Sequence, residues 1–295
     1  MKLAMDGEIQ TGAARGWRKA IPPGRDRLQS RMLVWPLVAL LLAVMALELW
    51  SQPWGEMHVR WLPAPTAFSI VFALVVWRMR AATLPAAALG GVVCMNLLLV
   101  QPTNWLDTAL PALMVLFVLT FAATRFGRRR KETMGAGEPR QGRRASQIVA
   151  NLGIAGLCAA GISGAWLATC IAALAEATAD TVSSEMGQAL GGTTRMITTG
   201  RKVPAGTDGG VSLMGTALGA AAAATVVSVA VLCGTISLHA ALPAFSASIV
   251  GLIFDSVLGA TVERWGWIGN DWVNFASTVL AAALTYVLAQ HRLPG

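Results

Sequence analysis

Long uncharged apolar runs alternate with short polar connections along most of the chain. Most of these runs approach the roughly 20 apolar residues that a helix needs to cross a membrane. Two runs, 145–175 and 211–254, are too long for one upright helix, and we expect the second to break around Ser237–Pro243. The pattern predicts an all-α, polytopic transmembrane helix bundle of about eight or nine spans. The uncharged runs are 32–47, 62–77, 81–101, 108–124, 145–175, 211–254 and 272–290.

The composition supports this membrane class. Hydrophobic residues make up 55% of the 295 positions and charged residues only 13%, whereas soluble domains carry about 25% charged residues. The four cysteines all lie inside apolar runs without a CxxC spacing, and the three histidines are scattered. We therefore expect neither a disulfide framework nor a His-rich metal site.

Basic residues orient the predicted bundle. Residues 1–31 hold seven Lys and Arg and residues 125–144 hold eight, out of 23 in the chain. The positive-inside rule places both segments on the cytoplasmic face, and Arg78 and Arg80 then fall inside as well. We expect an integral protein of a bacterial inner (plasma) membrane with a cytoplasmic N-terminus. Topology also explains the net charge of +8, so no nucleic-acid partner is expected.

The chain divides into four parts in this interpretation. They are a cytoplasmic basic N-terminal tail (1–31), a four-span N-terminal membrane part (32–124), a cytoplasmic basic loop (125–146) and a C-terminal membrane part (147–290). The spans of the N-terminal membrane part contain few polar residues, and Asn96 is the main exception. Acids, amides and glycines gather in the C-terminal part. An acid within lipid usually faces a cavity, a partner or an ion, so we look there for function.

Helical spacing and topology place these polar residues together. Asp180 lies four residues after Glu176 and shares its helix face, and Asn270 and Asn274 share another face. Glu185 lies off the face of Asp180, and Glu176 is interpreted as incidental. The orientation set by the basic segments brings every polar cluster of the C-terminal part toward the cytoplasmic side.

The stretch RKVPAGTDGGVSLMGT, residues 201–216, is an unusual sequence to find between two apolar runs. Its proline stiffens a turn, and its glycines permit positive φ and close backbone approach. Successive backbone N–H groups of such a turn can form an anion-binding nest, beside the N-terminal end of a helix expected from about Val211. Asp208 is placed to hold a Mg²⁺ ion that bridges to phosphate. No GKS or GKT follows, so this is not a Walker A loop; an ordinary connector with an Asx-turn is the alternative.

These features predict phosphoryl chemistry on a lipid at the membrane surface, which depends on positioning and on charge neutralisation. The predicted catalytic residues are Asp180, Asp208, Asp255 and Asp271. The predicted Mg²⁺ ligands are Asp180, Glu185, Asp208 and Asp255. The predicted substrate-binding residues are Arg143, Arg144, Asn151, Arg201, Lys202, Gly206, Thr207, Gly209, Gly210, Asn270 and Asn274.

Five motifs occur in a fixed order over about residues 124–290. They read GEPRQGRRASQIVANLG, EATADTVSSEMG, RKVPAGTDGGVSLMGT, GLIFDSVLGATVE and NDWVNF. This set resembles an integral membrane family whose members include the animal transmembrane protein 19 and the plant phytyl-phosphate kinase. The resemblance implies a polytopic kinase that converts an isoprenoid monophosphate to its diphosphate with a nucleoside triphosphate. CTP is the expected nucleotide. Val182 and Ser183 depart from the bulkier residues expected there.

A second function class stays open, namely a membrane transporter or lipid carrier that uses the same acids for cation or proton coupling. Transporters place their sites near the bilayer midplane between related halves, whereas these acids cluster toward one face. All four predicted catalytic acids in one cytoplasmic pocket would favour the enzyme, and a polar path across the bilayer would favour the transporter. In a purely structural interpretation, Asp180 and Asp255 only link helices. We expect the run Arg128–Lys131 to set topology and to contact anionic lipid.

Overall fold

The structure is a computed structural model that describes residues 21–51, 62–100, 104–134, 142–159, 161 and 164–290. Most of the predicted N-terminal tail, the predicted external connections 52–61 and 101–103, and residues 135–141 of the basic loop lie outside the described residues. The N-terminal helices are α2 (Pro23–Ser51), α4 (Pro63–Arg78), α5 (Leu84–Leu99), the short 3₁₀ turn η1 (Trp105–Asp107), α6 (Leu110–Arg125) and α7 (Arg128–Thr133). The C-terminal helices are α8 (Ala145–Cys158), α9 (Gly164–Leu190), α10 (Leu213–Leu232), α11 (Leu238–Leu258) with its π-helical extension η2 (Gly259–Glu263), and α12 (Asn270–Gln290).

Helices dominate the described chain, which confirms an all-α membrane protein. Among the described residues, α2, α10, α11 with η2, and α12 are each long and apolar enough to cross a membrane. The shorter apolar helices are α4, α5, α6 and α8. The count of eight or nine spans stays a prediction.

The two longest apolar runs each divide into two helices, as their lengths require. Run 145–175 is shared by α8 and α9, and α9 continues unbroken to Leu190. Run 211–254 breaks after α10, slightly before the predicted position, and Pro243 lies inside α11. The break falls there because Gly234 adopts a positive φ of 80° just after α10, the left-handed conformation that commonly ends a helix.

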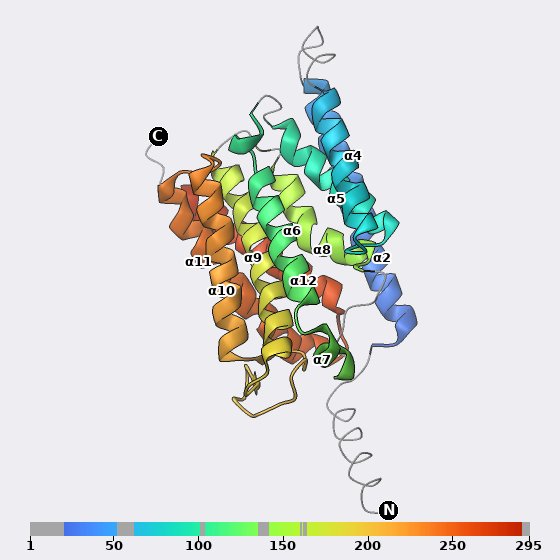
Figure 1. The fold of residues 1–295 in the computed structure, drawn as a ribbon, viewed down its shortest axis with the longest axis vertical. Coiled ribbons are helices and arrows are strands. Elements are labelled where there is room, and N and C mark those ends of the chain that lie inside the picture. The colour runs from blue at the N-terminus through green and yellow to red at the C-terminus, as the bar shows by residue number, and fades with distance from the viewer. Residues whose placement is uncertain are drawn as a thin grey trace, which may run out of the picture.

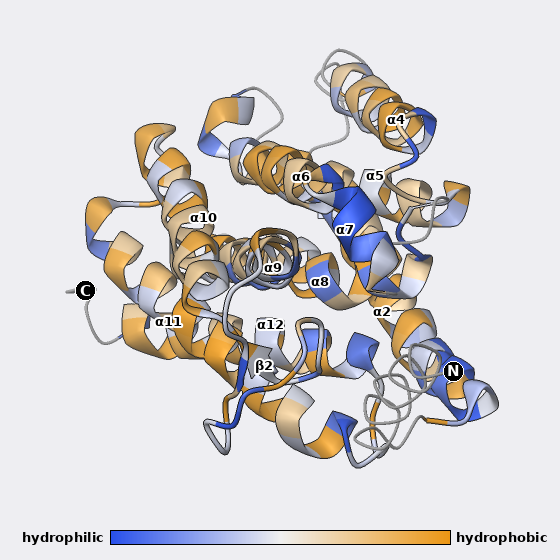
Figure 2. Cartoon of the chain, turned by 60° about the horizontal axis from the view of Figure 1, so that its bottom comes forward, coloured by the Kyte–Doolittle hydropathy of each residue, from blue (hydrophilic) through white to orange (hydrophobic). Residues whose placement is uncertain are grey.

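Helix α9 is the centre of the bundle, and α6, α8, α10, α11 and α12 pack around it (Figures 1 and 2). Its residues 171–175 are completely buried. Helix α10 crosses α9 closely through Gly215 and Gly219, where an added Cβ would lie only 2.6 Å from the carbonyl oxygens of Ser183 and Ala179. These two glycines therefore fix the start of α10, and the loop before it, against the acidic end of α9.

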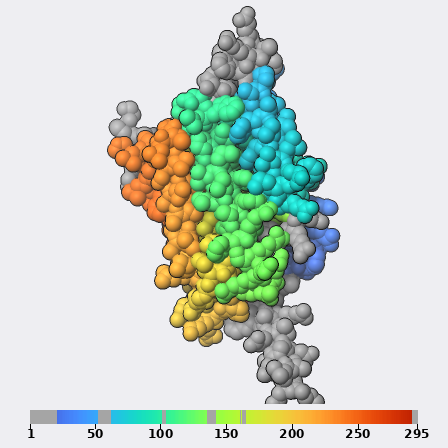
Figure 3. Space-filling view, in the orientation of Figure 1, coloured from blue at the N-terminus to red at the C-terminus, as the bar shows by residue number. Residues whose placement is uncertain are grey.

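Helices α4 and α5 form a hairpin that lies beside α6 on the flank of the bundle (Figure 3). The turn between them is tied to the start of α8 by two main-chain hydrogen bonds. Arg143 N–H donates to the Ala81 carbonyl at 3.0 Å, and Thr83 N–H donates to the Arg143 carbonyl at 3.0 Å. The preceding Gly142 is required by this contact, because a Cβ there would overlap the Ala81 backbone. The backbone of residue 143 is thus held by the N-terminal membrane part.

The short helix α7 of the basic loop contains a buried lysine. The sequence pattern assigned Arg128–Lys131 to topology and lipid contact, but Lys131 is only 1% exposed. Its ammonium group donates to the Glu185 carboxylate at 2.5 Å and to the Ala123 and Thr124 carbonyls at 2.9 and 2.8 Å. The surface assignment is wrong for Lys131, because the end of α6 and the side of α9 enclose it.

Candidate functional site

A polar pocket opens at the end of the bundle where α9 and α11 finish and α8 and α12 begin. It encloses about 1140 Å³ of empty space, including its open mouth. Hydrophilic segments gather at this end of the molecule, around α7, the loop that carries β2 and the start of α12 (Figure 2). Of the predicted site residues, the pocket is lined by Arg143, Asn151, Asp180, Glu185, Gly206, Thr207, Asp208, Gly209, Gly210, Asp255, Asn270 and Asn274.

Two carboxyl groups meet on one wall of this pocket. Asp180 projects from α9 and Asp255 from α11, and the two groups lie close enough to share a hydrogen bond. Ser277 of α12 donates to Asp255 Oδ2 at 3.4 Å. Two ionised carboxylates repel one another at such a distance unless a proton or a cation lies between them. This wall is therefore suited to binding a cation.

The opposite charge comes from Arg143 at the start of α8. One of its guanidinium nitrogens donates to Thr181 Oγ1 at 3.2 Å, which holds the side chain beside Asp180. Farther along α8, Asn151 Oδ1 accepts from Asn274 Nδ2 at 3.3 Å and so joins α8 to α12 across the pocket. The predicted partners of an anionic ligand and the predicted acids are thus adjacent.

The loop between α9 and α10 covers the pocket with the GTDGG residues. Its strands β1 (Arg195–Met196) and β2 (Gly210–Val211) pair antiparallel and shape it into a hairpin-like lid. Gly206 and Gly209 adopt positive φ values of 81° and 72°, as predicted, whereas Gly210 lies in β2. Gly209 packs directly on the backbone of Ala260, where a Cβ would overlap it. The glycines therefore let the loop lie against η2, which brings Asp208 into the pocket lining.

Four predicted site residues lie outside the pocket lining. Asp271 immediately follows Asn270, and consecutive helical residues point about 100° apart, so its carboxylate turns toward α2. It is buried there and accepts from Ser30 Oγ at 2.6 Å. The other three, Arg144, Arg201 and Lys202, are exposed. The roles predicted for these four residues stay predictions that their positions do not favour.

Glu185 lines the pocket, but its carboxylate already forms an ion pair with a lysine side chain. Its Oε2 accepts from the buried Lys131 ammonium group. It is therefore held differently from Asp180 and Asp255, and its predicted role as a Mg²⁺ ligand stays a prediction.

Several lining residues are not among the predicted catalytic, substrate-binding or metal-binding residues. The most informative are Gln147, Ser184, Gln188 and Glu263. The helical spacing indicates two of them, because Gln147 precedes Asn151 by four residues and Ser184 follows Asp180 by four, which places each pair on one helix face. Glu263 is the last residue of the motif GLIFDSVLGATVE, and it reaches the pocket from the π-helical turn η2.

The pocket fits a magnesium ion only if substrate supplies part of the coordination. Within the described ranges, no group of three or more Asp, Glu, His or Cys side chains is arranged to hold a metal ion. Mg²⁺ characteristically takes one or two carboxylates together with phosphate oxygens and waters. The adjacent Asp180 and Asp255 carboxyl groups match that donor set.

The arrangement defines a polytopic helical membrane protein with a polar, charged pocket at one end of its bundle. The chain belongs to the integral membrane protein family DUF92, whose family model matches residues 67–282. This match confirms the family expected from the motifs. It also extends beyond the motif region to include α4, α5 and α6.

Three curated relatives are similar over part of the chain. An uncharacterized membrane protein of Synechocystis sp. is 36% identical over 177 residues, which are 57% of this chain and 69% of the relative. The chloroplastic protein VTE6 of Arabidopsis thaliana is 33% identical over 187 residues, 59% of this chain and 56% of the relative. An uncharacterized membrane protein of Methanocaldococcus jannaschii is 33% identical over 124 residues, 39% of this chain and 48% of the relative. The match thus spans only about half the length of the Arabidopsis and Methanocaldococcus proteins. No solved structure matches the chain.

Proposed function

We propose that this protein is a membrane-embedded kinase of an isoprenoid monophosphate, such as phytyl phosphate, with CTP as the phosphoryl donor. The observation that carries the proposal is the polar pocket, in which Asp180, Asp208 and Asp255 lie together with Arg143 and the glycine loop. A phosphotransferase needs this combination of carboxylates for a metal, a cation for phosphate, and backbone N–H groups at close range. The motif resemblance supplies the isoprenoid substrate and the nucleotide.

The reaction does not require the protein to remove a proton from the attacking phosphate. At neutral pH a phosphate monoester is largely a dianion, because its second pKa is about 6. An oxygen of the isoprenoid phosphate attacks the γ-phosphorus of CTP, a new P–O bond forms, and the bond to the β–γ bridging oxygen breaks to release CDP. The protein therefore has to bring two anions together and neutralise their charge, rather than remove a proton.

Each lining residue has a role in this scheme. Asp180 and Asp255 would hold Mg²⁺, and a bound ion would neutralise charge on the transferring phosphate. Arg143 attracts the phosphate of the lipid substrate, with Thr181 fixing its direction. The main chain around Gly206 and Gly209 lines the pocket and would bind the nucleotide phosphates, and Asp208 would help to hold the metal ion. Asn151 and Asn274 hold α8 and α12 in register across the pocket.

The topology belongs to the same proposal. We assign the pocket to the cytoplasmic face of a bacterial inner membrane, with a cytoplasmic N-terminal tail and basic loop flanking a four-span part, and about eight or nine spans in total. Arg80, just after α4, and Arg125, at the end of α6, lie near Arg143, which also lines the polar pocket. This clustering of basic residues supports the orientation.

The alternative, a transporter or lipid carrier, requires a polar path that continues across the bilayer. Glu176 lies one turn deeper on α9 than Asp180, and the next residues inward, Ala172 and Ala173, are completely buried in apolar packing. Glu176 is not part of the pocket lining. The pocket therefore ends within one half of the bundle, which favours the kinase.

The test is a transfer assay with the purified full-length protein in detergent. It contains Mg²⁺, CTP or ATP labelled in the γ-phosphate, and phytyl or geranylgeranyl monophosphate. Label should appear in the lipid diphosphate, and Asp208→Asn and Asp255→Asn should abolish it. Asp107→Asn is the matched control, because Asp107 lies in η1 outside the pocket and pairs with Asn104.

The outcome is decisive in either direction. Transfer that is lost in the two pocket variants and retained in the control supports the kinase. Failure of the folded protein to label any isoprenoid phosphate with either nucleotide would overturn the proposal, and flux assays on the same acids would then be the next step.

A further inference from the structure

A second cavity lies beside the polar pocket, between the α4–α5 hairpin, α6 and α8. It encloses about 1000 Å³ of empty space including its opening, and its lining is mainly apolar. Phe72 and Val76 of α4 form one wall, and Leu116 and Phe117 of α6 form another. The rings of Phe72 and Phe117 pack edge to face with their centroids 5.6 Å apart, and this contact closes one side of the cavity. Small residues of α5 leave it open, notably Gly90, where an added Cβ would meet nothing within 4 Å.

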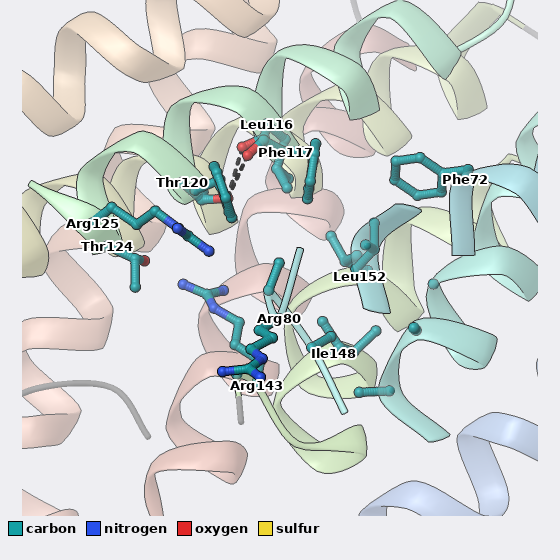
Figure 4. Close-up of a pocket in the computed structure, with 18 of the residues that line it drawn as sticks. Phe72, Arg80, Leu116, Phe117, Thr120, Thr124, Arg125, Arg143, Ile148 and Leu152 are labelled. Carbon is teal, nitrogen blue, oxygen red and sulfur yellow. Dashed lines mark hydrogen bonds between the residues drawn. The ribbon is translucent and has the colours of Figure 1, made fainter. Parts of the chain in front are cut away.

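Positive charge is concentrated at one end of this apolar cavity. Figure 4 shows the side chains of Arg80, Arg125 and Arg143 gathered there, with Phe72 and Leu152 toward the other end. Arg125 stacks over the Phe121 ring at 4.2 Å and donates to the Met79 carbonyl at 2.6 Å, which directs its guanidinium group to the mouth. An apolar chamber with a cationic mouth is complementary to a molecule that has one apolar chain and one anionic head.

Two of the three arginines at the mouth, Arg80 and Arg125, form no ion pair with a carboxylate of the described residues. The structure pairs Arg128 with Glu132 and Lys131 with Glu185. Arg80 and Arg125 are exposed, so an external anion can reach both guanidinium groups and form charge-assisted hydrogen bonds with them.

Arg80 also occupies a position that normally belongs to glycine. It follows the end of α4 with a φ of 55°, the one positive value recorded for a described residue other than glycine. Its N–H donates to the Trp77 carbonyl, and the next N–H, that of Ala81, donates to the Val76 carbonyl, the hydrogen-bond pattern of a Schellman helix end. Glycine would satisfy this turn without strain, so the backbone does not explain the arginine, whereas an anion at the mouth does.

We propose that this cavity holds the isoprenoid chain of the lipid substrate and that Arg80, Arg125 and Arg143 bind its phosphate. The inference rests on the proposed kinase function and adds where the lipid lies. Arg143 lines both the apolar cavity and the polar pocket. A phosphate bound to Arg143 therefore sits on the wall that separates the two spaces, where a nucleotide in the polar pocket can reach it.

The experiment measures binding of radiolabelled geranylgeranyl monophosphate to the full-length protein in detergent, with no nucleotide present. Gly90→Leu fills the cavity at a position with open space, and it replaces a helical glycine with a good helix former, so the variant should fold. Ala88→Leu is the matched control, because Ala88 is exposed on the same helix and does not line the cavity. Arg80→Gly removes the charge without disturbing the turn.

Gly90→Leu should weaken binding by more than about tenfold, since even one misfitting methylene changes affinity by about that factor in a tight apolar site. Arg80→Gly should weaken binding of geranylgeranyl monophosphate but not of geranylgeraniol, while Ala88→Leu should bind both as the wild type does. Phosphatidylglycerol and inorganic phosphate serve as competitors, and displacement by either as effectively as by the isoprenoid phosphate would overturn the assignment to this lipid. Unchanged binding of geranylgeranyl monophosphate by Gly90→Leu would overturn the assignment of this cavity as the lipid site, even if phosphoryl transfer is observed. If binding is weakened in Gly90→Leu but no phosphoryl transfer is observed with the wild type, the cavity would be confirmed as the lipid site and the kinase function would be refuted.

Discussion

The buried ammonium group of Lys131 should be one of the most sensitive single positions in the basic loop. It makes three close contacts, with the Glu185 carboxylate and with the Ala123 and Thr124 carbonyls. Both carbonyls belong to the last turn of α6, where main-chain acceptors lack partners within the helix. Lys131→Met keeps the aliphatic stem but leaves these acceptors unpaired and Glu185 charged and buried. Removing one partner of a buried ion pair costs about 3–5 kcal/mol of unfolding free energy.

The assay is SDS-induced unfolding in mixed micelles, followed by tryptophan fluorescence, for which the chain has 11 tryptophans. Arg129→Met is the matched control, since its exposed neighbouring side chain should change stability by less than about 0.5 kcal/mol. Combining Lys131→Met with Glu185→Gln removes the uncompensated charge and should recover part of the loss. A cost below about 1 kcal/mol for Lys131→Met, the range of exposed pairs, would refute the burial argument.

Three further substitutions test the packing and the site, each by the same unfolding assay. Arg80→Gly should raise the unfolding free energy by about 1 kcal/mol, because it relieves a left-handed residue; a decrease would show that the side chain stabilises the fold. Gly215→Leu should lower the unfolding free energy by about 1–3 kcal/mol or more, because the new side chain meets the Ser183 carbonyl and forces α10 away from α9. A variant as stable as the wild type would contradict the close crossing of the two helices. Asp271→Asn should cost about 1 kcal/mol through the Ser30 hydrogen bond and should reduce phosphoryl transfer far less than Asp208→Asn; equal losses of transfer would return Asp271 to the site.

The sequence predicted the location of the polar pocket because two simple rules act over the whole chain. Uncharged runs define helices, and basic segments orient them, so polar residues near the same ends must meet. Asp180 and Asp255 are far apart in sequence, yet both lie near the predicted cytoplasmic ends of their helices, and the structure brings them side by side. The GTDGG loop joins them because it connects two helices at that end.

What sequence could not predict depends on rotation and on long-range partners. Asp271 and Asn270 are adjacent, and only the packing of α12 against α2 decides which one faces the pocket. Lys131 stands in a run of basic residues typical of a cytoplasmic loop, and its burial follows from a carboxylate 54 positions away. The apolar cavity gave no signal, since Phe72 and Gly90 are ordinary residues of apolar helices until α4, α5 and α6 are placed around one space.

The position of Arg143 shows why the N-terminal membrane part belongs to the site although its spans carry few polar residues. Its main chain is hydrogen-bonded to the α4–α5 turn, while its side chain reaches Thr181 on α9 beside Asp180. A shift of the α4–α5 hairpin therefore moves the guanidinium group relative to the acids. Filling the cavity between α4, α5 and α6 with a lipid chain would act on the same hairpin, so the apolar substrate would help to set the geometry of the polar pocket. Lipid binding and catalytic alignment would then be one event, which gives α4 and α5 a functional reason to form part of this fold.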